Sequence, residues 1–206
     1  MFEIVEVDEK SRGDIVERLR SDLLHNFFTI YDLLYEPEKT TMYAAYGNNS
    51  SLRGHLRIYE SFTTLPLACS GELNGEERLA HKLLELLPSK NMVLFCPSSL
   101  LNVVKKKFPE AFCYPIYRMY IAKGEECLVT PNLAERLKPE YASLLAELYS
   151  SGEPQYARSE ERCRELLDKQ RAYGVFAGDK LASVAVAVER LPEAWEIIGV
   201  FTHPYY

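Results

Sequence analysis

Residues 13–34 carry apolar side chains at helical spacing, separated by polar ones. The pattern predicts one helix over residues 13–34, which ends before Pro37 because proline cannot continue a helix. The apolar stripe of this helix consists of Ile15, Leu19, Leu23, Leu24 and Phe27. Residues 42–46 and 52–59 then read as two strands, joined across Gly47-Asn48-Asn49-Ser50, and a third strand is expected over residues 62–69.

The helical period returns after Gly71, and its apolar face is formed by Leu79, Leu83, Leu84 and Leu87. A short buried strand is expected over residues 92–96. Ser98 or Ser99 can cap a following helix whose inward side chains are Leu100, Leu101, Val104 and Phe108. Residues 112–122 are rich in aromatic and branched side chains, and they predict a closing strand.

A similar order of elements begins again in the second half. A helix is expected from Leu133 to Leu148, and Ser159 can cap a second helix over residues 160–170. A hairpin across Gly178-Asp179-Lys180 would join strands 173–177 and 181–189, and residues 195–202 predict one more strand.

The repeated order predicts an α/β (α+β) fold of two related lobes, residues 1–124 and 125–206. Each lobe is expected to hold a mixed, mostly antiparallel sheet flanked by helices. The second lobe stops after its third strand, so by comparison with the first it is expected to be incomplete.

Composition narrows the function classes. The 206 residues are 47% hydrophobic and carry a formal net charge of −6, which argues against a general nucleic-acid or anionic-membrane surface. The basic run Lys105-Lys106-Lys107 suits the last turn of a helix, where cations favour the carbonyl end of the dipole. No signal peptide or membrane-spanning run is visible, so a cytoplasmic protein is expected. The cysteines show neither zinc-ligand spacing nor a disulfide framework, and no metal is expected.

Two segments carry a resemblance to a known family. Residues 173–188 resemble the second and third strands of the GNAT superfamily of acyl-CoA N-acyltransferases. Residues 195–206, WEIIGVFTHPYY, resemble the fourth strand of that family and the turn that leads into its phosphate-binding loop. In the family that loop reads R/Q-x-x-G-x-G/A, and it would begin after Tyr206. The chain is therefore expected to be truncated before the loop.

The resemblance implies acetyl-CoA as co-substrate. Backbone groups of Val200, Phe201 and Thr202 would bind its pantetheine arm in the manner of an added strand, while the loop's N–H groups would bind its pyrophosphate. The resemblance also implies a catalytic base on the fourth strand, where Glu196 lies. A solvent-facing glutamate without a catalytic role is the alternative. His203 falls where the strand must stop, which favours a turn histidine.

The first lobe departs from the family pattern. Where a phosphate loop is expected it reads CSGELNGEE over residues 69–77, and these carboxylates would repel a pyrophosphate. A non-catalytic copy of the fold is predicted, and an unrelated α/β domain is the alternative.

The complete protein is thus expected to transfer acetyl from acetyl-CoA to a small-molecule or protein amine, and the truncated chain to be inactive. The alternative is a GNAT-like binding or scaffold module without catalysis. In that case the exposed edge of the sheet in the second lobe could pair with another copy of the chain to form a homo-oligomer.

Overall fold

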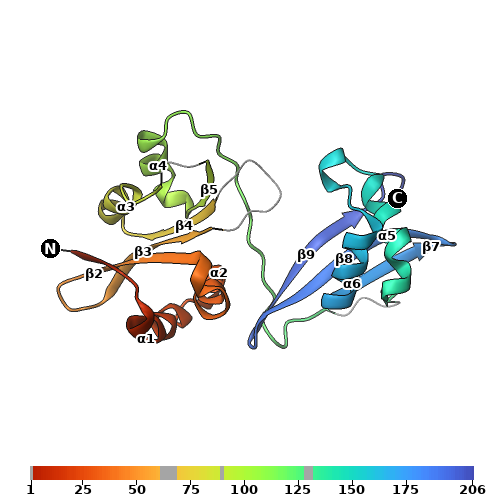
Figure 1. Cartoon of the computed structure of the whole chain (residues 1–206), viewed down its shortest axis with the longest axis horizontal. Coiled ribbons are helices and arrows are strands. Elements are labelled where there is room, and N and C mark those ends of the chain that lie inside the picture. Colours follow the sequence, from red (N-terminus) through yellow and green to blue (C-terminus); the bar gives the residue numbers. More distant parts are fainter. Residues whose placement is uncertain (1, 61–68, 89–90, 128–131) are drawn as a thin grey trace. The chain divides into compact units, whose positions relative to one another are not determined.

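The computed structural model describes residues 2–60, 69–88, 91–127 and 132–206. The chain forms two compact units, Met1–Tyr120 and Ile121–Tyr206, here called the first and second units (Figure 1). The boundary between them falls after Tyr120, whereas the sequence pattern places it after Gly124.

The first unit holds a five-stranded sheet in the order β1-β2-β3-β4-β5. The first four strands pair antiparallel, and β5 runs parallel to β4. The strands are β1 (Glu3–Glu6), β2 (Thr40–Tyr46), β3 (Leu52–Tyr59), β4 (Cys69–Gly75) and β5 (Met92–Phe95). The predicted hairpin between β2 and β3 forms, and Gly47 N–H donates to Ser51 O across its turn.

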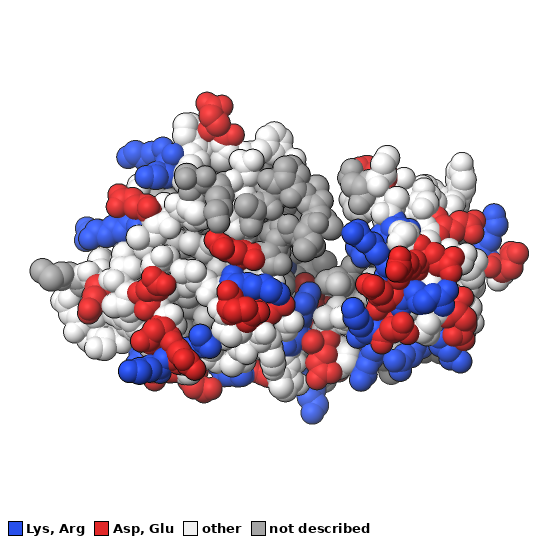
Figure 2. Space-filling model, viewed as in Figure 1, with Lys and Arg blue, Asp and Glu red and all other residues white. Residues whose placement is uncertain are grey.

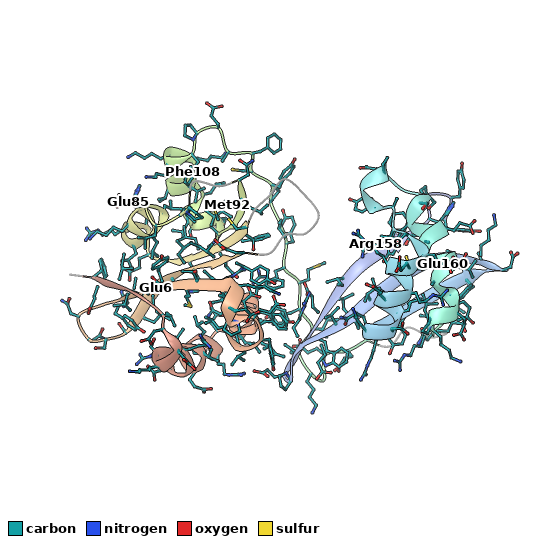
Figure 3. All side chains as sticks on the ribbon, in the orientation of Figure 1. Glu6, Glu85, Met92, Phe108, Arg158 and Glu160 are labelled. Atoms are coloured by element: carbon teal, nitrogen blue, oxygen red, sulfur yellow. The ribbon has the colours of Figure 1, made fainter. Side chains whose placement is uncertain are left out.

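Helices cover both faces of this sheet. α1 and α2 lie on one side and α3 and α4 on the other (Figure 1). Their bounds are α1 (Glu9–Arg20), α2 (Leu23–Tyr35), α3 (Glu77–Leu84) and α4 (Leu101–Lys107), with short 3-10 turns at η1 (Pro37–Lys39) and η2 (Ser98–Leu100). Met92 and Phe108 pack against the apolar core that α3 and α4 share with the sheet (Figure 3).

The second unit holds a four-stranded antiparallel sheet in the order β6-β7-β8-β9. Its strands are β6 (Glu135–Arg136), β7 (Arg171–Ala177), β8 (Lys180–Leu191) and β9 (Ala194–Thr202). The turn between β7 and β8 contains Gly178, whose φ of 65° lies in the left-handed region that glycine adopts without a steric penalty. The predicted hairpin is therefore present.

Two helices lie against one face of the second sheet (Figure 1). They are α5 (Ala142–Ser150) and α6 (Glu160–Lys169), with 3-10 turns at η3 (Pro139–Tyr141) and η4 (Pro154–Tyr156). Ser159 caps α6 as predicted, because its side chain accepts a hydrogen bond from Arg162 N–H at 3.3 Å. The core of this unit joins α5 and α6 to β7, β8 and β9. The predicted fold class, two α/β lobes with mostly antiparallel sheets, is confirmed.

Three predicted elements differ from the structure. The helix expected over residues 13–34 is two helices, because the chain turns at Ser21 and Asp22 although the apolar stripe continues. The helix expected from Leu133 begins only at Ala142, after β6 and the turn that contains Pro139. Residues 112–122 form no strand: their large apolar side chains are 66% to 90% exposed, and no neighbouring strand pairs with them in the described part of the chain.

The third strand predicted for the first unit covers residues 62–69. Residues 62–68 of the predicted strand lie outside the described residues. The strand that is described, β4, begins at Cys69 and runs to Gly75, so α3 begins only at Glu77. The segment interpreted as a degenerate phosphate loop, residues 69–77, is therefore mostly strand.

Candidate functional site

The four predicted site residues, Glu196, Val200, Phe201 and Thr202, all lie on β9. A β-bulge in this strand separates Glu196 from Phe201 and Thr202. Phe201 stands opposite Val184 and Ile198 opposite Val186, so that Gly199 and Val200 share the single partner position between them. Gly199 has a φ of 57°, in the left-handed region. Bulges of this kind bend a strand and interrupt its pairing, and they are common beside active sites.

β9 is the last strand of its sheet, and no strand pairs with its outer edge within the described ranges. His203 N–H donates to Ala182 O at 2.8 Å. Because backbone groups alternate in direction along an antiparallel strand, Thr202 N–H and C=O then point away from β8, towards the open edge. The same alternation turns the backbone of Phe201 towards β8. The backbone contacts predicted for Val200, Phe201 and Thr202 stay predictions, and the register favours Thr202.

The side chain of Phe201 anchors this end of β9 to α5. Its ring lies 5.8 Å from that of Tyr149, and Tyr149 OH donates to Gly199 O at 3.4 Å. Burial raises the pKa of Tyr149, so the phenol stays protonated and able to donate. Arg158 lies over the Tyr149 ring at 5.2 Å (Figure 3). The bulge is therefore held from the helical side of the sheet.

Glu196 lies four residues before Val200 on β9, about 13 Å along a strand. It stands opposite Val188, a core residue, so its side chain is on the face that α5 and α6 cover. Arg190 Nε donates to Glu196 Oε2 at 2.9 Å, and the Glu196 side chain is 22% exposed. It is thus a half-buried, oriented carboxylate rather than a fully solvated one. Its catalytic role stays a prediction.

His203 lies after the end of β9, in a turn, as expected. Its Nδ1 accepts a hydrogen bond from Tyr205 N–H at 3.2 Å, and its ring contacts those of Tyr205 and Tyr206. These contacts give the imidazole a local structural partner at the turn.

We expect Gly199→Ala to lower the free energy of unfolding by about 1 to 2 kcal/mol, because a Cβ disfavours left-handed backbone. The new methyl would also lie 3.1 Å from Tyr149 Oη. Gly178→Ala is the matched control, since Gly178 has a similar φ but open space around it. Urea denaturation should show the larger loss for Gly199→Ala. Equal losses would mean that the Tyr149 contact does not constrain the bulge.

A second polar centre, which the sequence did not reveal, lies in the first unit between α2 and the sheet. Arg57 on β3 is 4% exposed, and its guanidinium contacts Asp32 Oδ2 at 3.1 Å and Glu72 Oε2 at 3.3 Å. It also donates to Ser70 Oγ at 3.1 Å, and Thr29 Oγ1 donates to Glu72 Oε2 at 3.3 Å. We call these five residues, with Asn26 and His55, the buried polar cluster.

Glu72 corrects the interpretation of residues 69–77. Instead of lying in a loop that repels phosphate, it stands opposite Arg57 on the neighbouring strand and pairs with it. Glu76 precedes α3 and pairs with Arg53. Both carboxylates are thus occupied by arginines of β3. A pattern search along the sequence misses these pairs because the partners are 15 and 23 residues apart.

His55 of the buried polar cluster should make stability depend on pH. Burial, assisted by the charge of Arg57, lowers the pKa of His55 from 6.5 to about 4. The unfolded chain therefore binds a proton between pH 6.5 and 4 that the folded chain does not. The contribution of neutral His55 to the free energy of unfolding is therefore fully present above pH 6.5. It is lost as the pH falls towards 4, by about 3 kcal/mol in total.

Denaturant titrations at pH 7 and pH 4 measure this loss. His55→Asn, which does not titrate, should show a shallower pH dependence of unfolding free energy than the wild-type chain. His81→Asn, at an exposed position on α3, is the matched control. An unchanged slope in His55→Asn would show that His55 is not the group responsible.

A shallow groove of 460 Å³ lies in the first unit and shares no lining residue with either polar centre. Burial and the neighbouring Glu6 raise the pKa of Tyr43 at its wall. The groove is lined by Ile4, Glu6, Tyr43, Lys82, Glu85 and Leu86 (Glu6 and Glu85 are labelled in Figure 3). Its residues coincide with none of the predicted site residues.

Acidic and basic side chains are interspersed over the visible face of each unit (Figure 2). Among the described residues, no group of three or more histidine, cysteine, aspartate or glutamate side chains is placed to hold a metal ion. No helix in the described ranges has both the length and the apolar character needed to cross a membrane.

No family model matches the sequence, and no curated protein matches it. Among solved structures, a Drosophila protein of 11% identity is similar over 98% of this chain and 78% of its own, with a TM-score of 0.56. A tandem GNAT protein from the clavulanic acid biosynthesis pathway is 13% identical and matches 100% of this chain and 80% of its own, with a TM-score of 0.43. A ribosomal-protein-alanine N-acetyltransferase from Brucella melitensis is 14% identical and matches 60% of this chain and 99% of its own, with a TM-score of 0.36. At 11% identity, the similarity to the Drosophila protein concerns the fold alone.

Proposed function

We propose that this chain is a tandem GNAT-like protein whose second unit binds acetyl-CoA along β9 and transfers its acetyl group to an amine. The observation that carries the proposal is the bulge at Gly199 and Val200, directly before a strand end whose Thr202 backbone faces an open edge. An extended amide chain such as pantetheine can add to such an edge as a further strand. The bulge bends the strand where this ligand would enter.

Each residue then has a defined task. Thr202 N–H and C=O would pair with the pantetheine amides and hold the thioester beside the bulge. The amine nitrogen attacks the thioester carbonyl, a C–N bond forms, and the C–S bond breaks to release the CoA thiolate. Glu196 would accept the proton from the amine through water, since about 13 Å of strand separates it from Val200. Its ion pair with Arg190 fixes the direction of the carboxylate.

The acceptor is proposed only as a class, a small-molecule or protein amine. Acetyl-CoA with a panel of primary amines and amino-terminal peptides tests the proposal, with release of the CoA thiol as the readout. In place of the inactivity expected from the sequence, we expect amine-dependent release above the rate without protein, because the proposed contacts on β9 do not use the phosphate-binding loop. Calorimetry with acetyl-CoA alone makes the test independent of the panel: a folded chain that takes up no acetyl-CoA would contradict the proposal.

A second candidate function, a non-catalytic interaction module, is favoured by the outer edge of β9, which pairs with no strand in the described ranges, and by the adjoining sheet face that α5 and α6 leave uncovered. Trp195, Ile197 and Val200 are 42%, 63% and 66% exposed there. The partner in this case is a second copy of the chain. Its β9 would pair with the open edge of β9 in the first copy, about a twofold axis.

The same edge cannot pair with pantetheine and with a second β9. Sedimentation velocity with and without acetyl-CoA therefore separates the two candidates. Trp195 is the single tryptophan, so its fluorescence reports on this face. A dimer that acetyl-CoA dissociates supports both uses of the edge, whereas a monomer at all concentrations rules out the module built on β9 pairing.

A further inference from the structure

Arg118 lies in the irregular segment after α4, and its guanidinium contacts α2 and β4 of the same unit. Nη1 donates to the carbonyl oxygens of Leu24 at 2.9 Å and His25 at 3.3 Å. The guanidinium carbon lies 5.1 Å from the centre of the Phe28 ring, and Nη2 lies 3.8 Å from Glu72 Oε1. Four groups that are far from Arg118 in sequence thus converge on one cation.

These four groups are typical of a site that recognises a planar cation. Two carbonyl oxygens accept hydrogen bonds, a carboxylate supplies the opposite charge at 3.8 Å, and an aromatic face attracts the positive charge. All of them lie on regular elements: Leu24, His25 and Phe28 on α2, and Glu72 on β4. The site is therefore built by the helix and the sheet, and does not need the irregular segment to exist.

Charge in the adjoining cluster favours a cation at this position. Asp32 and Glu72 contribute two carboxylates, and Arg57 contributes one guanidinium between them. The depressed pKa of His55, caused by burial, keeps that imidazole neutral at pH 7. Without Arg118 the cluster holds one formal negative charge in excess, and a buried excess charge is costly unless a counter-charge is near.

Glu72 divides its two oxygens between the two arginines. Oε2 accepts from Arg57 and Thr29 inside the unit, while Oε1 faces Arg118, whose side chain is 42% exposed. Arg57 is thus a fixed part of the interior, and Arg118 occupies the solvent side. A cation from solution can reach the position of Arg118 but not that of Arg57.

We propose that Phe28, Glu72 and the carbonyl groups of Leu24 and His25 form a binding site for the guanidinium group of a ligand, which Arg118 occupies as an internal ligand. A small alkylguanidine or an arginine side chain of a peptide competes with Arg118 for the same acceptors. Binding of such a ligand releases the segment that follows α4. This site lies in the first unit and is independent of acetyl transfer on β9.

Arg118→Ala empties the site and tests the proposal. Ethylguanidinium is titrated into the variant and into the wild-type chain by calorimetry at low millimolar concentration, with neutral ethylurea as the matched probe. We expect saturable binding of ethylguanidinium to Arg118→Ala, at least tenfold weaker binding to the wild-type chain, and no binding of ethylurea. An arginine-containing tripeptide, titrated in parallel, distinguishes a peptide side chain from a small guanidine as the preferred source.

Two double variants locate the binding. Arg118→Ala/Glu72→Gln should lose the affinity for ethylguanidinium, and Arg118→Ala/Phe28→Leu, which leaves the buried ion pair intact, should weaken it severalfold. Far-UV circular dichroism establishes that each variant is folded. Binding to Arg118→Ala that is no tighter than to the wild-type chain, or that survives in both double variants, overturns the proposal.

Discussion

Arg57→Ala should lower the free energy of unfolding by about 3 to 5 kcal/mol, the largest loss of stability that we expect from a single side chain. The substitution leaves the carboxylates of Asp32 and Glu72 without the guanidinium that lies between them at 3.1 and 3.3 Å. Both carboxylates are nearly buried, so water cannot replace the lost partner at low cost. Urea denaturation at pH 7 measures the effect.

Arg164→Ala provides the matched control. Arg164 contacts Glu160 at 2.7 Å, but both side chains are about half exposed. Solvent-exposed pairs of this kind contribute about 0 to 1 kcal/mol. A loss for Arg57→Ala that is as small as the loss for Arg164→Ala would show that the buried polar cluster is hydrated and does not depend on its central guanidinium.

Glu196→Gln should lower kcat/KM for acetyl transfer by about 100-fold, because the amide cannot accept the proton that the attacking amine must lose. Its shape is nearly that of the carboxylate, and the Arg190 contact at 2.9 Å can be kept through the amide oxygen. Rates of CoA release with the best acceptor of the panel provide the measurement.

Glu189→Gln is the control for this substitution, since Glu189 is exposed near the same end of the sheet, opposite Trp195. Its kcat/KM should equal that of the wild-type chain. If both substitutions had an equally small effect on kcat/KM, the ion pair of Glu196 with Arg190 would be purely structural. Another group would then have to accept the proton from the amine.

Elements whose signals are local were predictable from the sequence. Ser159 caps α6 through a hydrogen bond three residues away, and Gly178 supplies the backbone angle that the β7–β8 turn requires. The alternation of apolar residues identified β9 within one residue of its start and at its end. Caps, turns and short periodicities depend only on neighbouring residues, so a single sequence is sufficient to find them.

Elements that depend on distant partners were not predictable. Residues 112–122 have the composition of a strand, but a strand also needs an edge to pair with, and Pro115 lacks one of the N–H donors. The break between α1 and α2 at Asp22 leaves the apolar stripe intact, so periodicity alone cannot locate it. Glu72 was placed in a loop because its pairing with Arg57 exists only once β3 and β4 are side by side.

The candidate site shows the same division. The positions of Glu196 and of the strand end at Thr202 followed from the sequence, while the bulge did not. Gly199 alone does not specify a bulge. The bulge becomes evident only from the register, in which Gly199 and Val200 together face one position of β8. This register, rather than any side chain, directs Thr202 to the open edge.

Amide hydrogen exchange at Thr202, followed by NMR with and without acetyl-CoA, tests the central claim most directly. If pantetheine adds to β9 as a strand, the Thr202 N–H gains a hydrogen-bond partner, and its exchange should slow at least tenfold when acetyl-CoA saturates the chain. The Phe201 N–H, which faces β8, should change little. Binding of acetyl-CoA that leaves the exchange of Thr202 unaltered would contradict the claim that β9 holds the cofactor.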